Sequence, residues 1–202
     1  MAQTRASERR RLAPDERRQM IVEAAVTFFS QVGLDGTTRE LSQRMGVTQS
    51  LIYNYFGSKA DLIEAVFEKV YLERLSPAWP SLITDRSLPV RERARLFYGE
   101  YTRAIFTYEW MRIFMFSGLA GAELNRRYLG HMSKLILQPL CAEMAASARG
   151  SRHPQMEDIW NLHGGIVYIG IRKFVYFVPT PDDCTSAVNA AIDRFCDSYQ
   201  ID

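Results

Sequence analysis

The sequence has few of the residues that metal sites, disulfides and membrane spans require. Its 202 residues include three cysteines without a C-x-x-C pair and three histidines without metal-ligand spacing. These numbers predict neither a disulfide framework nor a zinc site, and they fit a reducing cytoplasm. The longest uncharged apolar run, residues 113–122, is too short to span a bilayer. We therefore expect a soluble cytoplasmic protein with no metal, no cofactor and no membrane contact.

Sustained alternation of apolar and polar residues, which would indicate half-buried strands, is also missing. Apolar residues instead recur at helical spacing, as at Ile21, Ala25, Phe28 and Val32 after a helix start at Pro14. Residues 166–178 are β-branched and aromatic enough for a strand. The length of the apolar segment favours a helix.

Net charge is small, at +2, but it is unevenly distributed. Residues 1–59 contain nine Lys/Arg against six Asp/Glu, and the remainder contains sixteen against seventeen. Residues 1–13 carry four of these arginines and offer no apolar face, so they form either a solvated tail or an arm that contacts nucleic acid. The basic excess indicates where a polyanion would bind.

Within the basic part, residues 37–62 predict two short helices joined by a tight turn and followed by a third helix. Thr37 and Thr48 are placed to cap the first two helices, and Gly46 can take the left-handed conformation that ends the first. Ser58 is placed to cap the third. Two helices joined by a turn of this length form a helix-turn-helix pattern.

The second helix of such a pair can enter a DNA major groove with its N-terminal residues against the base edges. Gln49 can pair with adenine, Ser50 allows close approach, and Leu51 can touch a thymine methyl group. The next side chains can reach phosphate oxygens: Tyr53, Asn54, Tyr55 and Lys59.

The same stretch resembles the DNA-binding domain of the TetR family of bacterial transcriptional repressors. The family pattern appears here as Thr37-Thr38, Leu41, Gly46-Val47-Thr48, Tyr53-x-Tyr55-Phe56 and Lys59. The resemblance covers about the first third of the chain. It implies that Arg39 and Gln49 face bases and that the following residues face phosphates: Thr38, Tyr53, Tyr55 and Lys59. Ser50 stands where many members carry glycine.

The resemblance also implies the architecture. We expect an all-α fold of about nine helices, with an arm and a three-helix DNA-binding domain at 1–59 and a helical effector-binding and dimerisation domain at 60–202. It further implies a homodimer that binds a palindromic operator and is released by a small molecule, with the last two helices at the dimer interface. Glycine weakens a helix by about 0.5–1 kcal/mol, so either close approach of a partner helix or the subunit's own packing explains Gly164, Gly165 and Gly170.

An apolar cleft with a few polar groups is the usual form of a small-molecule site. Aromatic and polar side chains of the C-terminal part are candidates for its lining, although each of them is also an ordinary core residue. They are Trp110, Phe114, Tyr128, His131, Trp160, His163, Tyr168 and Arg172. Their composition favours an apolar or aromatic effector.

Two other classes of function compete with a DNA-binding regulator. A helical enzyme is disfavoured because the segment around Ser117 lacks the preceding glycine and the strand of a nucleophile elbow. A helical protein-interaction module without DNA binding is the second alternative, and the basic arm and Lys59 argue against it.

Overall fold

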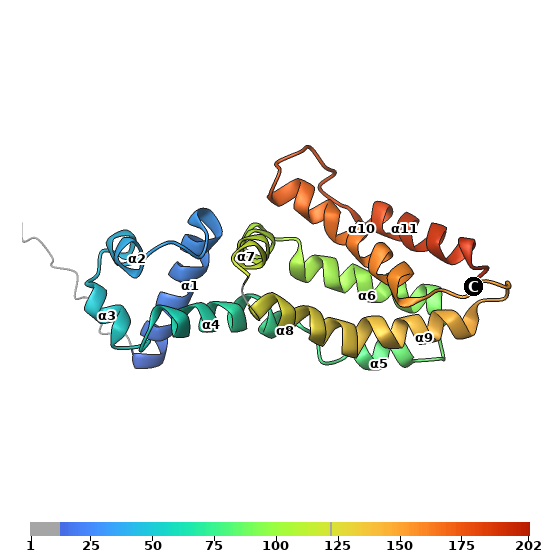
Figure 1. Cartoon of the computed structure of the whole chain (residues 1–202), viewed down its shortest axis with the longest axis horizontal. Coiled ribbons are helices and arrows are strands. Elements are labelled where there is room, and N and C mark those ends of the chain that lie inside the picture. The colour runs from blue at the N-terminus through green and yellow to red at the C-terminus, as the bar shows by residue number, and fades with distance from the viewer. Residues whose placement is uncertain (1–12, 122) are drawn as a thin grey trace, which may run out of the picture.

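The computed structural model describes residues 13–121 and 123–202, and within these ranges it contains helices and no strand. The all-α class is thereby confirmed. The predicted arm at 1–13 lies outside the described residues except for Ala13. The molecule is elongated, with α1, α2 and α3 at one end and α4 leading away from them (Figure 1).

The elements at the N-terminal end are α1 (Pro14–Val32), α2 (Thr38–Met45), α3 (Gln49–Tyr53) and α4 (Lys59–Val70). The apolar side chains between them are fully buried, including Ile21, Phe28, Leu41, Ile52 and Leu62. Helix α1 begins at Pro14 with acidic residues in its first turn and ends at Gly33, as its sequence predicts. The buried side of α1 differs from the predicted one, because Phe29 is buried whereas Val32 is 42% exposed.

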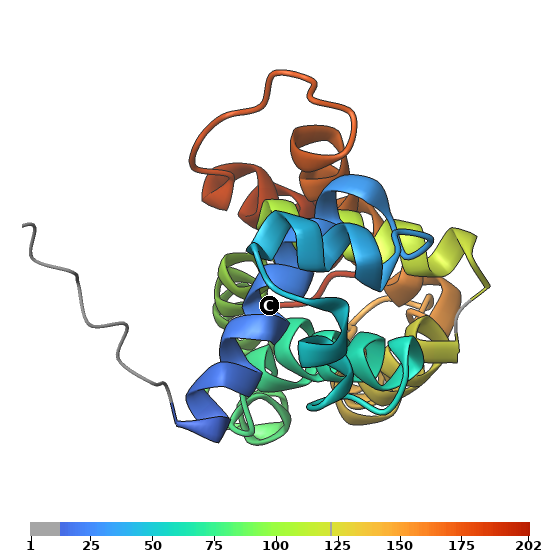
Figure 2. The ribbon, with the colours of Figure 1, turned by 90° about the vertical axis from the view of Figure 1, so that its left-hand side faces the viewer.

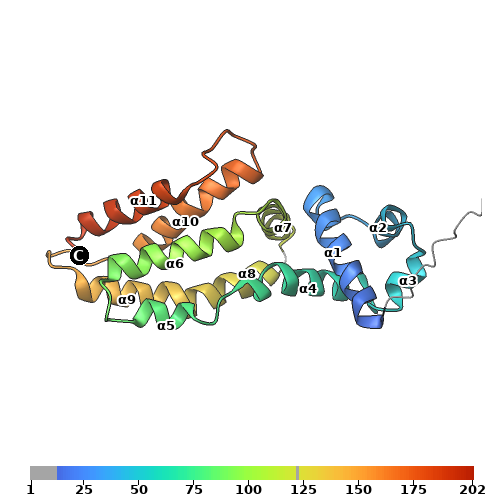
Figure 3. The same cartoon turned by 180° about the vertical axis from the view of Figure 1, so that it is seen from behind.

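The remaining helices form the body of the molecule. They are α5 (Trp79–Thr84), α6 (Val90–Ile105), α7 (Tyr108–Leu119), α8 (Glu123–Met132), α9 (Gln138–Ser147), α10 (Met156–Phe174) and α11 (Thr185–Ser198). Helix α6 runs through the middle of the body, with α5, α8 and α9 on one side and α10 and α11 on the other (Figure 3). Residues 166–174, which are strand-like by propensity, belong to α10 because burial of its apolar side outweighs local preference.

The connection from α4 to α6 contains a short 3₁₀ helix and one α-helix. Helix α4 ends at Val70 and is followed by the 3₁₀ helix η1 (Leu72–Arg74). Pro80 lies in the first turn of α5. Proline is tolerated there because the first N–H groups of a helix have no partner within the helix.

The helix type changes shortly before Pro139. A π-helical segment, η2 (Ser133–Leu137), separates α8 from α9 directly before this proline. Proline has no N–H to donate and crowds the preceding turn, which favours a local change of hydrogen-bond register. Residues 123–147 therefore form two α-helices with a π segment between them.

Candidate nucleic-acid interface and ligand core

The turn between α2 and α3 is built by capping groups that the sequence predicts. Thr37 caps α2 by accepting from the Glu40 N–H at 3.2 Å, and Glu40 accepts from the Thr37 N–H at 2.8 Å. These hydrogen bonds hold the pKa of Glu40 below its usual range. Gly46 ends the helix with a φ of 64°, and Thr48 caps α3. The local geometry of the helix-turn-helix is confirmed.

Helix α3 is held in place on its inner side by one apolar and two polar contacts. Ile52 is fully buried, and Thr38 of α2 forms a 3.0 Å hydrogen bond with the Tyr53 hydroxyl. Gln49 Nε2 also donates to Thr38 Oγ1 at 2.9 Å. Thr38 itself is 4% exposed, so its hydroxyl positions α3. Its predicted phosphate contact stays a prediction.

The outer side of α3 is open to solvent at the end of the molecule, as seen along the long axis in Figure 2. Gln49, Ser50 and Asn54 are exposed, and Tyr53 is 42% exposed. The exposed set also contains Arg39 and Thr48, whereas three predicted contact residues are half-buried: Leu51, Tyr55 and Lys59. Apart from the buried Thr38, every predicted contact residue therefore has part of its surface open to solvent.

Lys59 is the first residue of α4, and Ser58 caps that helix by accepting from the Asp61 N–H at 3.1 Å. A lysine side chain beside a helix N-terminus combines a positive charge with the positive end of the helix dipole. This arrangement suits a phosphate oxygen, as the sequence predicts.

A contact that the sequence analysis missed joins the N-terminal helices to the body. Arg112 of α7 donates from Nε to the Ser30 carbonyl oxygen at 2.6 Å, near the C-terminal end of α1. Its guanidinium lies 5.1 Å from the ring centroids of Tyr108 and Phe116. A cation at the end of a helix stabilises the helix dipole. The partner atom is a backbone carbonyl 82 positions away, so no sequence signal could identify it.

The eight predicted ligand residues separate into two groups. Trp110 and Tyr128 are 1% exposed and their ring centroids lie 5.6 Å apart, while Trp110 stacks on Phe114 at 4.9 Å. Tyr128 forms a 3.0 Å hydrogen bond with Tyr101, a residue that the sequence analysis did not predict at this site. The ring centroid of Tyr101 lies 5.3 Å from that of His163.

The other predicted ligand residues lie outside this cluster. His131 is exposed and Tyr168 is 50% exposed. Each lies on the side of its helix that faces away from the core of the body. Arg172 is half-buried beside Tyr168, and Trp160 is half-buried with its ring centroid 5.9 Å from that of His163. Helical spacing alone could not separate the buried aromatic residues from the exposed ones.

His163 is held neutral by its surroundings. It is 4% exposed, its ring faces Tyr98, Tyr101 and Trp160, and its Nδ1 lies 3.4 Å from the Tyr98 hydroxyl oxygen. Burial lowers the pKa of His163 to about 4, since the charged form loses its hydration. The core therefore contains a neutral imidazole at physiological pH.

The three glycines predicted at a dimer interface differ in their surroundings. Gly164 and Gly165 are exposed on α10, and a Cβ atom at either position would meet nothing within 4 Å. Gly170 is buried, and a Cβ atom there would lie 2.4 Å from Met111 and 2.8 Å from Phe106. For Gly170 the structure supports the second alternative, because the packing of α10 against Met111 of α7 and against Phe106 within the subunit requires this glycine.

Ser117 is a helix-packing residue. It lies in α7, is 1% exposed, and donates to the Phe114 carbonyl oxygen and to Asn125 of α8. A nucleophile elbow requires an exposed serine at a strand-to-helix turn. The environment of Ser117 has neither property.

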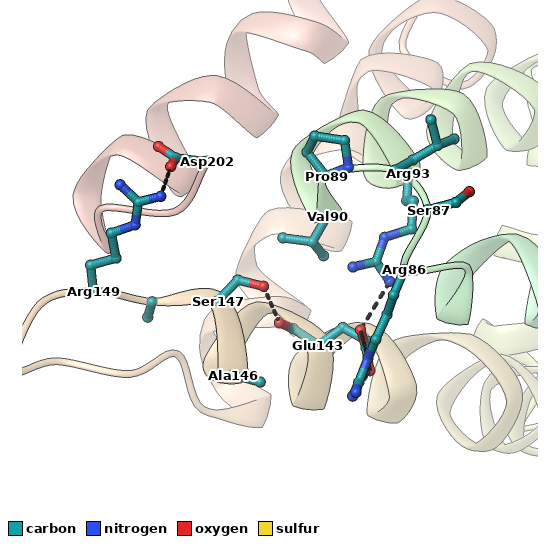
Figure 4. Close-up of a pocket in the computed structure, with 12 residues that line it drawn as sticks. Arg86, Ser87, Pro89, Val90, Arg93, Glu143, Ala146, Ser147, Arg149 and Asp202 are labelled. Atoms are coloured by element: carbon teal, nitrogen blue, oxygen red, sulfur yellow. Dashed lines mark hydrogen bonds and ion pairs between the residues drawn. The ribbon is translucent and has the colours of Figure 1, made fainter.

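A cleft of about 730 Å³ lies between the start of α6 and the end of α9 (Figure 4). Arg86 and Arg93 both pair with Glu143, at 2.8 and 3.0 Å, and Arg149 pairs with Asp202. The two arginines hold the pKa of Glu143 below its usual range. This cleft was not predicted, since its charged residues come from three separate segments. The arginines of this cleft are already paired with acidic groups. The ion pair between Arg93 and Glu143 connects α6 to α9.

Fold and site together define a helical protein with a helix-turn-helix exposed at one end and an aromatic core in its body. Comparison with known proteins agrees. Residues 21–66 match the family described as "Bacterial regulatory proteins, tetR family". Over 66 residues the chain is 36% identical to the class A tetracycline repressor protein from transposon 1721 of Escherichia coli, covering 32% of this chain and 31% of the repressor. The HTH-type transcriptional repressor KstR2 of Mycolicibacterium smegmatis is 26% identical over 89 residues, or 44% and 43% of the two chains.

Solved structures share the fold over most of the chain. A TetR-like transcriptional regulator from Rhodococcus sp. RHA1 matches with a TM-score of 0.70 and 17% identity, over 91% of this chain and 97% of that one. The regulator PfmR from Thermus thermophilus matches with a TM-score of 0.62 and 19% identity, over 87% and 96%. The chain is therefore similar to the TetR family in residues 21–66, and it shares the fold of these solved structures. It spans between about a third and two-fifths of the length of the curated relatives it matches.

No helix within the described ranges has the combination of length and hydropathy needed to cross a membrane.

Proposed function

We propose that the protein is a DNA-binding transcriptional repressor whose α3 enters the major groove of an operator. The observation that carries the proposal is the exposed outer side of α3, with Gln49 and Ser50 at its first turn and Ile52 and Thr38 fixing its inner side. A short helix whose orientation is fixed by its neighbours can hold side chains against base edges. Residues 1–59 form the operator-binding part in this proposal, and residues 60–202 form the effector-binding and dimerisation part.

A homodimer is part of the proposal, because two copies of α3 related by a two-fold axis bind a palindromic operator. The exposed side of α10 supports this assignment: Gly164 and Gly165 leave it open and the half-exposed Tyr168 lies one turn further along. Light scattering at micromolar concentration should give the mass of two chains. A monomer mass would contradict this part of the proposal.

A small molecule would release the operator by preferring an arrangement of the dimer that does not fit the two half-sites. We propose that it binds among the aromatic side chains of α7 and α8, which are Trp110, Phe114 and Tyr128. The cytoplasm, which contains the chromosome of a bacterium, is the compartment in which such a protein would work.

Two substitutions test the operator-binding role. Lys59→Ala should weaken binding to all duplexes and reduce the salt slope by about one unit, since one phosphate contact is lost. Gln49→Ala should cost about 1–3 kcal/mol, mainly at one base pair of each half-site. Binding isotherms on matched and mismatched duplexes at several salt concentrations measure both effects.

The main alternative, a helix-turn-helix that binds another protein, predicts a different result. Duplex binding by the wild type would then be weak, independent of sequence and unaffected by Gln49→Ala. That outcome would refute the proposed function.

A further inference from the structure

Three side chains of the helix-turn-helix form a continuous chain of hydrogen bonds, which we call the polar relay: Gln49, Thr38 and Tyr53. Gln49 Nε2 of α3 donates to Thr38 Oγ1 of α2 at 2.9 Å, and the Tyr53 hydroxyl of α3 lies 3.0 Å from the same Thr38 oxygen. Thr38 is 4% exposed, whereas Gln49 is exposed and Tyr53 is 42% exposed. The relay therefore joins two solvent-facing side chains through one buried hydroxyl.

The proton of the Thr38 hydroxyl gives the relay a direction. A hydroxyl donates one proton and accepts at two lone pairs, and within the described part of the chain this hydroxyl bonds only to Gln49 and Tyr53. A buried proton without an acceptor is unfavourable, so Thr38 donates to one of its two partners. If it donates to Tyr53, it accepts from the Gln49 N–H. If it donates to Gln49 Oε1, it accepts from the Tyr53 O–H.

The direction of the relay decides which atoms Gln49 presents to DNA. When Gln49 donates to Thr38, its Oε1 and its second N–H remain free, and this pair of an acceptor and a donor matches N6 and N7 of adenine. When Gln49 accepts from Thr38, both N–H groups remain free, and two donors match the acceptors N7 and O6 of guanine. A half-turn of the amide therefore changes the preferred base.

Contact with a DNA phosphate selects one of the two directions. A phosphate oxygen only accepts hydrogen bonds, so a Tyr53 hydroxyl that contacts it donates its single proton there. Tyr53 can then only accept from Thr38, and Thr38 can then only accept from Gln49. This is the direction in which the structure has Gln49 Nε2 as the donor to Thr38.

We propose that the contact of Tyr53 with a phosphate holds the Gln49 amide in its adenine-binding orientation through the Thr38 hydroxyl. Tyr53 and Thr38 are positioning residues in this inference, and Gln49 alone touches the base. The inference rests on the proposed function, in which α3 lies in the major groove. It adds that a contact with the DNA backbone controls the choice between adenine and guanine.

This role differs from that of an ordinary phosphate contact. Such a contact carries no sequence information of its own, so its loss weakens binding to all duplexes equally. Tyr55 provides the comparison, because it is half-buried and is also predicted to face a phosphate, but its hydroxyl is not part of the relay. Loss of the Tyr53 hydroxyl should alter base preference, and loss of the Tyr55 hydroxyl should not.

The test selects bound duplexes from a random pool with the full chain and sequences them. Selection with Gln49→Ala locates the base pair that Gln49 contacts, and the measured quantity is the ratio of adenine to guanine at that position. The wild type should prefer adenine about tenfold or more. Tyr53→Phe should lower this ratio at least fivefold, because the Thr38 proton then has Gln49 Oε1 as its remaining acceptor.

Matched variants separate positioning from general loss of affinity. On the duplex selected by the wild type, Tyr53→Phe and Tyr55→Phe should each weaken binding about three- to tenfold, but Tyr55→Phe should keep the wild-type ratio. Thr38→Ser retains the hydroxyl and should also keep the ratio. Thr38→Val removes the hydroxyl and should lower the ratio as Tyr53→Phe does.

Equal ratios in the wild type and in Tyr53→Phe would overturn the inference, and so would an equal fall in Tyr55→Phe. A wild type that selects a base other than adenine at the Gln49 position would overturn it as well. In these three cases the proposed function stands, because sequence-specific binding is observed. A wild type that enriches no sequence would refute the proposed function and the inference together.

Discussion

The N-terminal helices and the body differ in where their candidate functional groups lie. Around α3, the groups proposed to contact DNA are mainly exposed and lie within residues 38–59. In the body, the groups proposed to bind an effector come from α7 and α8, and Trp110 and Tyr128 among them are buried. A surface that meets a polymer can be specified by a short segment, whereas a buried site for a small molecule needs several helices.

The two regions therefore respond differently to substitution. Changes in the body should mainly alter the free energy of unfolding, and changes around α3 should mainly alter operator affinity. The following predictions test this difference, beginning with the largest expected effect.

The pH dependence of stability should be largest in the body, at His163. Its folded pKa of about 4 lies below its value in an unfolded chain, which is about 6.5. Between these values the unfolded state binds a proton that the folded state does not. Stability is full above pH 6.5 and should fall by about 3 kcal/mol as the pH drops to 4.

Urea unfolding at several pH values measures this effect. Other groups also titrate over this range, but they do so equally in the wild type and in the variants, so the difference between the proteins reports on His163. His163→Gln should show a smaller decrease in stability over the same range. His131→Gln, at an exposed position, should match the wild type. An unchanged slope in His163→Gln would contradict the assignment.

The two kinds of glycine on α10 provide a matched pair. Gly170→Ala should lower the free energy of unfolding by about 1–3 kcal/mol, because the new methyl group would overlap Met111 and Phe106. Gly164→Ala has open space and should raise the stability of the isolated subunit by about 0.5–1 kcal/mol. If Gly164 packs against a partner subunit, the same substitution should weaken the dimer in sedimentation experiments.

Thr38→Val removes the hydroxyl that joins α2 to α3. The loss of its hydrogen bonds to Gln49 and Tyr53 should lower stability by about 1 kcal/mol. Operator affinity should fall more strongly, because α3 is no longer held in one orientation. Ser42→Ala is the control, since Ser42 is equally buried but bonds only within α2. Equal operator affinities for the two variants would show that the hydroxyl does not position α3.

Arg112→Lys should have the smallest effect on stability, about 0.3–1 kcal/mol. Lysine keeps the charge but loses the planar group that lies over Tyr108 and Phe116. Hydrogen exchange should become faster at the C-terminal end of α1, where Ser30 accepts from Arg112. Arg103→Lys is the control, because Arg103 bonds to Gly99 of its own helix. No change in exchange would mean that Arg112 does not connect the two regions.

Local sequence was sufficient to predict much of the N-terminal part. Thr37, Gly46 and Thr48 cap or end helices through contacts within three or four residues, and a pattern can therefore reveal them. The exposure of Gln49 followed from its place at the start of α3. The burial of Thr38 did not, since it depends on Tyr53 and Gln49 reaching back from the next helix.

The body could be predicted less well, because its important contacts join distant segments. Helical spacing made Tyr128 and Tyr168 equal candidates, and only packing shows that the first is buried and the second exposed. Tyr101 was not among the predicted ligand residues, and its hydrogen bond with Tyr128 joins residues 27 positions apart.

The most direct test is to select bound duplexes from a random pool with the wild-type protein and to sequence them. The account predicts that the wild type enriches one sequence made of two inverted half-sites. Selection with Gln49→Ala should relax the preference at one base pair of each half-site. A pool without enrichment, or a single half-site bound by one subunit, would contradict it.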